Sequence, residues 1–285
     1  MRNMIYCTLM VAGAFTLAAC KDTGNADVNK APSALNVIDE SNLSDIMLSA
    51  ADPNEAVAYF QKSANENPDR LDLQRGLGQA LVRAGRATES LPVWKGVVAN
   101  PQSEHSDLVD YADALIRANN WPEAEVVLDQ IPPTYESFKR YRLEAMIADS
   151  NEEWTKSDSF YEIAVGLTTQ PSGVLNNWGY SKLTRGDFAA AEKLFGEALK
   201  YDGTLFTAKN NLTLARGAQR KYDLPIIPMS QTERAQLLHT LALAAIKQGD
   251  VVTGRGLLQQ AIETHPQHFE AAVRSMAALD ANVTN

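Results

Sequence analysis

Small and large apolar residues recur along this chain in a pattern that repeats about every 34 residues from Val37 onward. In each block the eighth position is small, and in every complete block the twenty-fourth is large and apolar. The small set is Ser44, Gly78, Ala112, Ala145, Gly179, Thr213 and Ala242. The large set is Phe60, Trp94, Leu128, Tyr161, Phe195 and Leu258. Small side chains let two helices approach closely and large ones fill the space around the contact. Each block therefore predicts one helical hairpin.

The blocks follow one another with little sequence between them. They cover residues 37–70, 71–104, 105–138, 138–171, 172–205, 206 to about 234, and 235–268. Gly85, Gly186 and Gly249 separate the two halves of a block, where a left-handed residue ends the first helix at little cost. A hairpin cannot bury both of its faces alone, so neighbouring hairpins must stack into a superhelix. Beyond Pro266, apolar residues at helical spacing predict a terminal cap helix.

Two blocks depart from the pattern. The fourth block has Glu144 where a large apolar residue is expected, which predicts looser packing of its first helix or a shift in its register. The sixth block has a first helix but no second, because Pro225 and Pro228 exclude a continuous helix. Ser230 and Glu233 then have the spacing of a capping box that starts the next helix. The solenoid is therefore predicted to be interrupted once.

The first residues predict a targeting sequence that is separate from the folded part of the chain. Residues 5–19 are almost wholly apolar, follow Arg2, and lead into Cys20 through the sequence LAAC. This length is typical of a signal peptide and short for a membrane-spanning helix. The LAAC sequence resembles the bacterial lipoprotein lipobox. That resemblance implies cleavage before Cys20 and attachment of lipid to its sulfur, which would anchor the protein to a membrane.

The chain is therefore expected to have three parts. Residues 1–19 are a signal peptide, 20–36 are the lipidated cysteine and a polar, flexible tether, and 37–285 are the solenoid, interrupted at about 220–232. Lys21 follows the lipid site. By resemblance to the lipoprotein sorting rule, it implies anchoring in the outer membrane facing the periplasm. An ordinary secretory signal and an N-terminal membrane anchor are the alternatives.

Composition and charge exclude several classes of function. The chain has 285 residues and a formal net charge of −9, which argues against a basic nucleic-acid-binding surface. Its two cysteines, Cys7 and Cys20, exclude a disulfide framework. No hydrolase, zinc-protease or phosphate-loop motif occurs. His265 and His268 have a spacing that suits a metal, but Pro266 lies between them and no companion ligand is near in sequence. We expect no catalytic residue, no metal site and no cofactor.

Helical periodicity also predicts which residues of the first helices face the concave side of the stack. The candidate partner-binding residues are Arg75, Gln79, Arg83, Asp113, Arg117, Lys139, Arg142, Asn176, Tyr180 and Asn210. Half of them are basic in an acidic chain, which favours an acidic segment or a C-terminal carboxylate as ligand. The alternative is scattered, solvated charge. Asn176 and Asn210 favour hydrogen bonds to an extended peptide, or else a structural role within the repeat.

The pattern from Val37 to His268 resembles the tetratricopeptide repeat, a family of stacked helix pairs. The resemblance implies an all-α right-handed superhelix of helical hairpins, and it says little about chemistry. Ser41 and Asp45 stand where the two-carboxylate clamp of chaperone-binding members needs Lys and Asn, so that clamp is not expected. The stretch 210–272, with its Pro-x-x-Pro break, combines with the lipobox and tether to resemble the TadD-type lipoproteins of tight-adherence (Flp) pilus assembly.

The second resemblance implies a function. It points to a periplasmic scaffold, tethered to the outer membrane, that binds protein partners and helps to assemble a secretin pore and pilus or a type II-like secretion machine. The first alternative is a cell-envelope adaptor that presents hydrolases or proteases to their substrates through a peptide bound in the groove. An enzyme is the third. Secretion ATPase, prepilin and secretin genes beside this gene would favour the first.

Overall fold

The computed structural model describes residues 43–283, and every regular element in that range is a helix. The chain divides into two compact units, residues 1–45 and 46–285, and the helical hairpins belong to the second. The predicted signal peptide, Cys20 and the tether lie outside the described residues. No helix within the described range is both long enough and apolar enough to cross a membrane.

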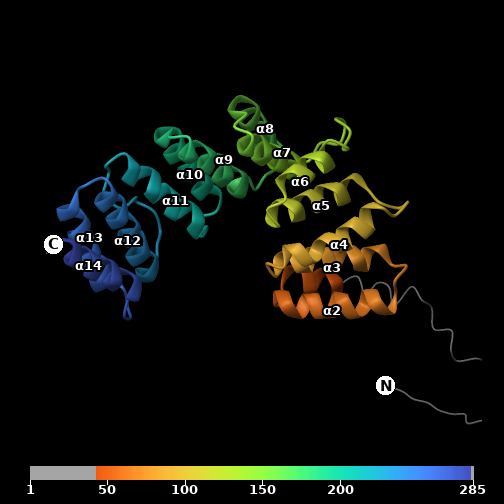
Figure 1. Cartoon of the computed structure of the whole chain (residues 1–285), viewed down its shortest axis with the longest axis horizontal. Helices are drawn as coiled ribbons and strands as arrows, with labels where there is room; N and C mark the ends of the chain where they lie inside the picture. The colour runs from red at the N-terminus through yellow and green to blue at the C-terminus, as the bar shows by residue number, and fades with distance from the viewer. Residues whose placement is uncertain (1–42, 284–285) are drawn as a thin grey trace, which may run out of the picture. The chain divides into compact units, whose positions relative to one another are not determined.

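Consecutive helices of the second unit pack as pairs in chain order (Figure 1). A helical stretch at 43–49 precedes α2 (Pro53–Glu66). The pairs are α3 (Leu71–Arg83) with α4 (Ala87–Val98), α5 (His105–Arg117) with α6 (Trp121–Leu128), α7 (Phe138–Ser150) with α8 (Trp154–Gly166), and α9 (Ser172–Thr184) with α10 (Phe188–Tyr201). The remaining helices are α11 (Phe206–Ala218), α12 (Gln231–Lys247), α13 (Val251–Thr264) and α14 (Glu270–Val283). The paired helices fall within the predicted blocks, so the predicted all-α solenoid with a cap helix is confirmed.

The alternation of small and large residues forms the contacts that close each hairpin. The indole of Trp94 on α4 lies so near Gly78 on α3 that a Cβ atom at Gly78 would be 2.6 Å from the ring. Phe195 on α10 lies against Gly179 on α9 in the same way, with a separation of 2.7 Å. Trp94 and Phe195 are 1% and 0% exposed. At this density of packing, a side chain at Gly78 or Gly179 would force the ring or the helices apart.

The turn inside each hairpin uses the left-handed backbone conformation. Gly85 and Gly186 have φ angles of 73° and 84°. Asn119 and Glu152 adopt the same conformation at equivalent turns, with φ of 62° and 59°. Glycine adopts this conformation without steric cost, whereas Glu152 must be held in it by the surrounding hairpin. The first helix therefore ends at the same place in each of these repeats, whichever residue occupies the turn.

The predicted interruption lies between α11 and α12. Residues 219–230 contain no helix, and α12 begins at Gln231. The predicted capping box is confirmed, because Ser230 Oγ accepts from the Glu233 N–H at 3.1 Å and Glu233 accepts from the Ser230 N–H at 2.7 Å. Without a second helix beside it, α11 approaches α12 directly. A Cβ atom at Gly217 would lie 2.8 Å from that of Ala244.

The extended segment at the interruption fills part of the place of the missing helix. Tyr222 and Leu224 pack on the core formed by α12, α13 and α14. Ile227 packs on the other side, against the core that contains Phe195 and Leu212. The segment therefore joins the two parts of the solenoid with apolar contacts on both sides.

Glu144 is accommodated by an ion pair. Its Oε1 lies 2.7 Å from Nε of Arg140, which also donates from Nη1 to the backbone carbonyls of Pro132 and Tyr135 at 2.8 Å. The eighth position of this block, Ala145, is still fully buried, so the predicted shift in register does not occur. The charge is balanced within α7 and the hairpin keeps its place in the stack.

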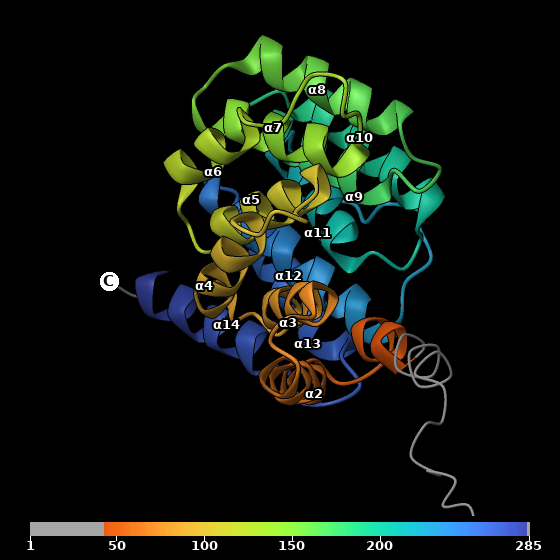
Figure 2. The same ribbon diagram turned by 90° about the vertical axis from the view of Figure 1, so that its right-hand side faces the viewer.

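The cap helix closes the C-terminal end of the described solenoid. Figure 2 shows α14 beside α13, and Ala272 and Leu279 of α14 share a buried core with Leu258. His239 on α12 hydrogen-bonds through Nε2 to Oγ of Ser275 on α14 at 3.0 Å. The helix thus covers apolar surface that the last hairpin alone would leave in water.

Candidate functional site

Three adjoining pockets follow the first helices of the repeats. The charged pocket, of about 330 Å³, is lined by Gln79, Val82, Arg83, Trp94, Asp110, Asp113, Arg117 and Lys139. The aromatic pocket, of about 510 Å³, is lined by Trp121, Met146, Asp149, Ser150, Trp154, Tyr161, Asn176, Asn177, Tyr180, Ser181, Thr184, Thr207 and Asn211. The apolar pocket, of about 630 Å³, is lined by Leu183, Phe188, Asn210, Leu214, Ala218, Thr240, Leu243, Ala244, Lys247 and Gln248. Most of the predicted groove residues line one of these three pockets, but Arg75 and Arg142 line none of them.

The charged pocket is built around two carboxylates of α5. Lys139 Nζ lies 2.5 Å from Asp110 and 3.2 Å from Asp113, and Arg117 Nε lies 3.0 Å from Asp113. Gln79 donates to Asp110 at 3.0 Å. Burial opposes the ionisation of Asp113, but the surrounding cations still hold its pKa below the ordinary value. Much of the basic charge predicted for this pocket is therefore balanced by α5.

Two other predicted cations hold the structure together. Arg75 forms a two-pronged ion pair with the buried Asp107, with both N–O distances at 2.7 Å. Arg83 donates to the backbone carbonyls of Met47 and Leu48 at 2.9 Å. The guanidinium thus satisfies carbonyl groups at the end of a helical stretch. Sequence reasoning missed these partners, although Asp107, Asp110 and Asp113 recur at a spacing that places them on one face of a helix.

Arg142 differs from the other predicted basic residues. Among the residues that the structure describes, no carboxylate forms an ion pair with it, and its buried Nε has no hydrogen-bond partner. Burial lowers the pKa of its guanidinium, although Asp113 opposes that shift. Its charge is therefore less well compensated than those of Arg117 and Lys139.

The aromatic pocket combines exposed rings with a buried carboxylate network. Asp149 accepts from Ser157 at 2.5 Å, from Ser181 at 2.7 Å and from the Tyr161 hydroxyl at 3.0 Å. Burial, reinforced by Asp149, raises the pKa of Tyr161 far above its ordinary range, so its hydroxyl stays a donor. The side chain of Tyr180, in contrast, is 54% exposed. The wall of the pocket is thus fixed while one ring faces solvent.

The predicted asparagines take part in contacts between repeats. Asn176 accepts from the side-chain amide of Asn211 at 3.2 Å, and Asn210 accepts from Thr240 at 2.8 Å. These bonds use one oxygen of each residue and leave the amide N–H groups of Asn176 and Asn210 without a partner in the described part of the chain. The structural and the ligand-binding interpretations of these residues are therefore compatible.

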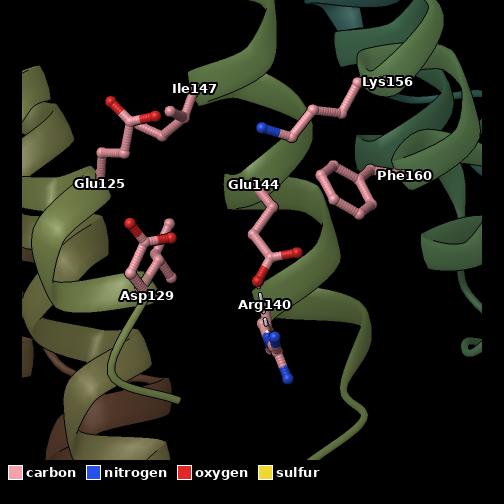
Figure 3. Close-up of a pocket in the computed structure, with 8 residues that line it drawn as sticks. Glu125, Asp129, Arg140, Glu144, Ile147, Lys156 and Phe160 are labelled. Carbon is pink, nitrogen blue, oxygen red and sulfur yellow. Dashed lines mark hydrogen bonds and ion pairs between the residues drawn. The ribbon is translucent and has the colours of Figure 1, made fainter. Parts of the chain in front are cut away.

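A fourth pocket, of about 230 Å³, lies among α6, α7 and α8, and sequence reasoning missed it. Figure 3 shows Glu125 of α6 and Asp129, which caps that helix, on one wall, and Lys156 and Phe160 of α8 on the other. The pocket forms where α6 ends early, at Leu128, before two consecutive prolines. That proline pair was the available signal.

Most of the charged groups that line this fourth pocket have a partner nearby. Arg140 binds Glu144, Lys156 binds Glu153 at 2.8 Å, and Glu125 accepts from Asn151 at 3.2 Å. The described residues contain no group of three or more His, Cys, Asp or Glu side chains placed to hold a metal ion. His265 contacts the backbone of Gln267 and His268 pairs with Glu270, so the two histidines have separate partners.

Comparison with known proteins supports the architecture. A sequence model described as the tetratricopeptide repeat matches residues 43–104. The solenoid is built of tetratricopeptide repeats. No curated protein matches the chain at a significant level of sequence similarity.

Several solved structures resemble the chain at low sequence identity. The Cut9–Hcn1 heterotetramer of the APC/C matches with a TM-score of 0.60 at 12% identity, over 83% of this chain and 48% of that one. A tetratricopeptide-repeat protein from Parabacteroides merdae matches with 0.56 at 10% identity, over 86% and 99%. The human IFIT1 dimer with m7Gppp-AAAA matches with 0.59 at 14% identity, over 84% and 61%. The chain thus spans about half the length of the first of these, and the likeness concerns the fold alone.

Proposed function

We propose that this protein is a non-catalytic scaffold that binds an extended segment of a partner protein along the charged, aromatic and apolar pockets. The observation that carries this proposal is the presence of partly exposed large side chains in adjoining pockets. Tyr180 is 54% exposed in the aromatic pocket and Leu243 is 45% exposed in the apolar pocket. Exposed aromatic and aliphatic groups in concave sites beside polar groups are typical of binding surfaces.

The polar groups of the pockets suit an extended backbone. The amide N–H groups of Asn176 and Asn210 come from α9 and α11, one repeat apart. A carboxamide donates to the carbonyl groups of an extended chain, while side chains of the ligand occupy the pockets on either side. The apolar contacts would then supply most of the binding energy, and the asparagine amides would fix the register of the bound peptide.

The biological setting that we propose is assembly of a tight-adherence (Flp) pilus or a type II-like secretion machine. The lipobox sequence at Cys20, the polar tether and the TadD-like pattern over 210–272 support it. A lipid anchor would concentrate the scaffold beside an outer-membrane pore, which raises the effective concentration of the partner. The alternative partners are envelope hydrolases or proteases presented to their substrates.

Photo-crosslinking tests the position of the binding site and the class of partner together. A photoreactive amino acid in place of Tyr180 or Leu243 is expected to capture the same partner in cells. The control is Ile163, which is 41% exposed on α8 and lines none of the pockets described above. Equal capture from Ile163 would refute the binding face. Secretin or pilus proteins in the captured band support the pilus setting, and hydrolases support the alternative.

The lipid anchor is tested by Cys20→Ala. This variant is expected to leave the membrane fraction for the soluble periplasmic fraction, because the residue that accepts the acyl chains is gone. Its helical content, measured by circular dichroism, should be unchanged, since the helical hairpins begin well beyond residue 20. If the variant stays in the membrane fraction, the lipoprotein assignment is wrong.

A further inference from the structure

Arg142 belongs to the lining of neither the charged nor the aromatic pocket, but its neighbours along α7 line both. It lies on α7 between Lys139, which lines the charged pocket, and Met146, which lines the aromatic pocket. The spacing of three and four residues places all three side chains on one face of the helix. A ligand that passes from the charged pocket to the aromatic pocket therefore crosses Arg142.

The guanidinium has donors to spare at this junction. Its Nε is buried and has no hydrogen-bond partner. The two terminal Nη groups are not among the buried atoms in this condition. No hydrogen bond from these Nη groups is formed to the described residues, so they remain accessible to solvent. Two parallel N–H donors of an arginine match the two oxygens of a carboxylate.

The charge around Arg142 also favours an anion. The charged pocket contributes Arg83, Arg117 and Lys139 but only the carboxylates of Asp110 and Asp113. Adding Arg142 leaves cations in excess at this place in a chain with a net charge of −9. A carboxylate of the ligand reduces this excess, whereas a polyanion such as a nucleic acid would be repelled by the acidic protein as a whole.

We propose that Arg142 binds a carboxylate of the partner segment through its Nη groups, and that a bulky apolar side chain next to that carboxylate enters the aromatic pocket. The ligand class is thus an acidic residue, or a C-terminal carboxylate, beside an aromatic or aliphatic residue. This inference rests on the proposed function, because it uses the same pockets. It adds that Arg142 is the residue that recognises the negative charge of the ligand.

Selection from a library of random peptides displayed on phage tests this assignment. The unmodified full chain is expected to enrich peptides with Asp or Glu beside a large apolar residue. Arg142→Gln should enrich peptides that keep the apolar residue and lose the acid. Arg86→Gln is the matched control: it removes the same charge from an arginine that is already paired with Glu89 and lines none of the pockets described above. It should therefore preserve the acidic preference.

The outcomes separate the two proposals. If no peptide is enriched by the unmodified chain, the proposed function itself fails. If peptides are enriched without an acidic preference, or if Arg86→Gln and Arg142→Gln lose it equally, the binding groove stands and the role of Arg142 is refuted. Should Arg142→Gln fold poorly by circular dichroism, Arg142→Met replaces it, because methionine keeps an apolar stem without charge.

A binding measurement then assigns the contact to a pair of groups. Fluorescence anisotropy with a selected peptide should show about tenfold weaker binding for Arg142→Gln, and a similar loss when Glu in the peptide is replaced by Gln. Combining both changes should cost little more than either alone, since they remove the same contact. Additive losses would place the carboxylate elsewhere.

Discussion

Replacing Phe195 with alanine is expected to lower the free energy of unfolding by about 3–5 kcal/mol. The ring is 0% exposed and lies against Gly179 in the neighbouring helix, with Leu212 and Ile227 in the same core. Alanine leaves a cavity that glycine on the opposite helix cannot fill. Chemical denaturation followed by circular dichroism measures the loss.

The matched control for Phe195 is a second phenylalanine in a different environment. Phe138 begins α7 and is 41% exposed. Phe138→Ala deletes the same atoms and should cost clearly less, because part of that ring is already in water. Similar losses at both positions would contradict the view that the contact between the eighth and twenty-fourth positions is what holds each hairpin.

Replacing Glu233 with glutamine is expected to lower the free energy of unfolding by about 3 kcal/mol. Glu233 lies 2.9 Å from Nζ of Lys209, whose side chain is only 4% exposed. The single oxygen of glutamine can still accept the Ser230 N–H in the capping box, while its NH2 group cannot accept from Lys209, so the ion pair is lost and the cap is kept. The variant leaves a buried ammonium without its counter-ion, at the point where α11 meets α12.

Removing both charges should reverse most of that loss. The double variant Lys209→Met/Glu233→Gln is expected to unfold near the denaturant concentration of the unmodified protein, since no buried charge is left unpaired. If the double variant is as unstable as Glu233→Gln, the effect comes from packing or capping, and the ion pair is not its cause.

The Lys209–Glu233 ion pair also makes the stability of the fold depend on pH. Hydrogen bonds from Lys209 and the Ser230 N–H hold the pKa of Glu233 below its ordinary value of 4.5. A carboxyl group whose pKa is lower in the folded state stabilises the fold at pH values above its pKa in the unfolded state. This stability is lost as the pH falls through its pKa in the folded state. Glu233→Gln should therefore flatten the decline of stability below about pH 4.5.

The fold was predictable because single residues at fixed positions of each repeat determine how its two helices pack. The same small-to-large contact occurs at the same spacing in different repeats, as in Gly78 with Trp94 and Gly179 with Phe195. The hairpins, the interruption and the cap helix could therefore be predicted from the sequence alone. These are contacts between neighbouring helices of known separation in sequence. The repeat itself supplies the alignment that a single sequence usually lacks.

The electrostatics of the candidate site could not be predicted in the same way. Helical periodicity placed Arg75, Arg83 and Arg117 on the binding face, but it could not show that Asp107 or a carbonyl group would take up their charge. Such partners depend on the rotation and distance between helices of different repeats. The unpaired state of Arg142 depends on the same distances, so it became visible only in the structure.

The missing second helix after α11 sets how the repeats share stability. In a linear array each unit is coupled only to its neighbours, and the free energy is a sum of unit and interface contributions. Here the helices α12, α13 and α14 are joined to the repeats before them through α11 and the segment around Tyr222 and Ile227. The coupling of the last three helices to the earlier repeats therefore depends on α11 and this one extended segment. We expect the last three helices to open as one unit, so that their amide hydrogens exchange with solvent while the preceding hairpins stay folded.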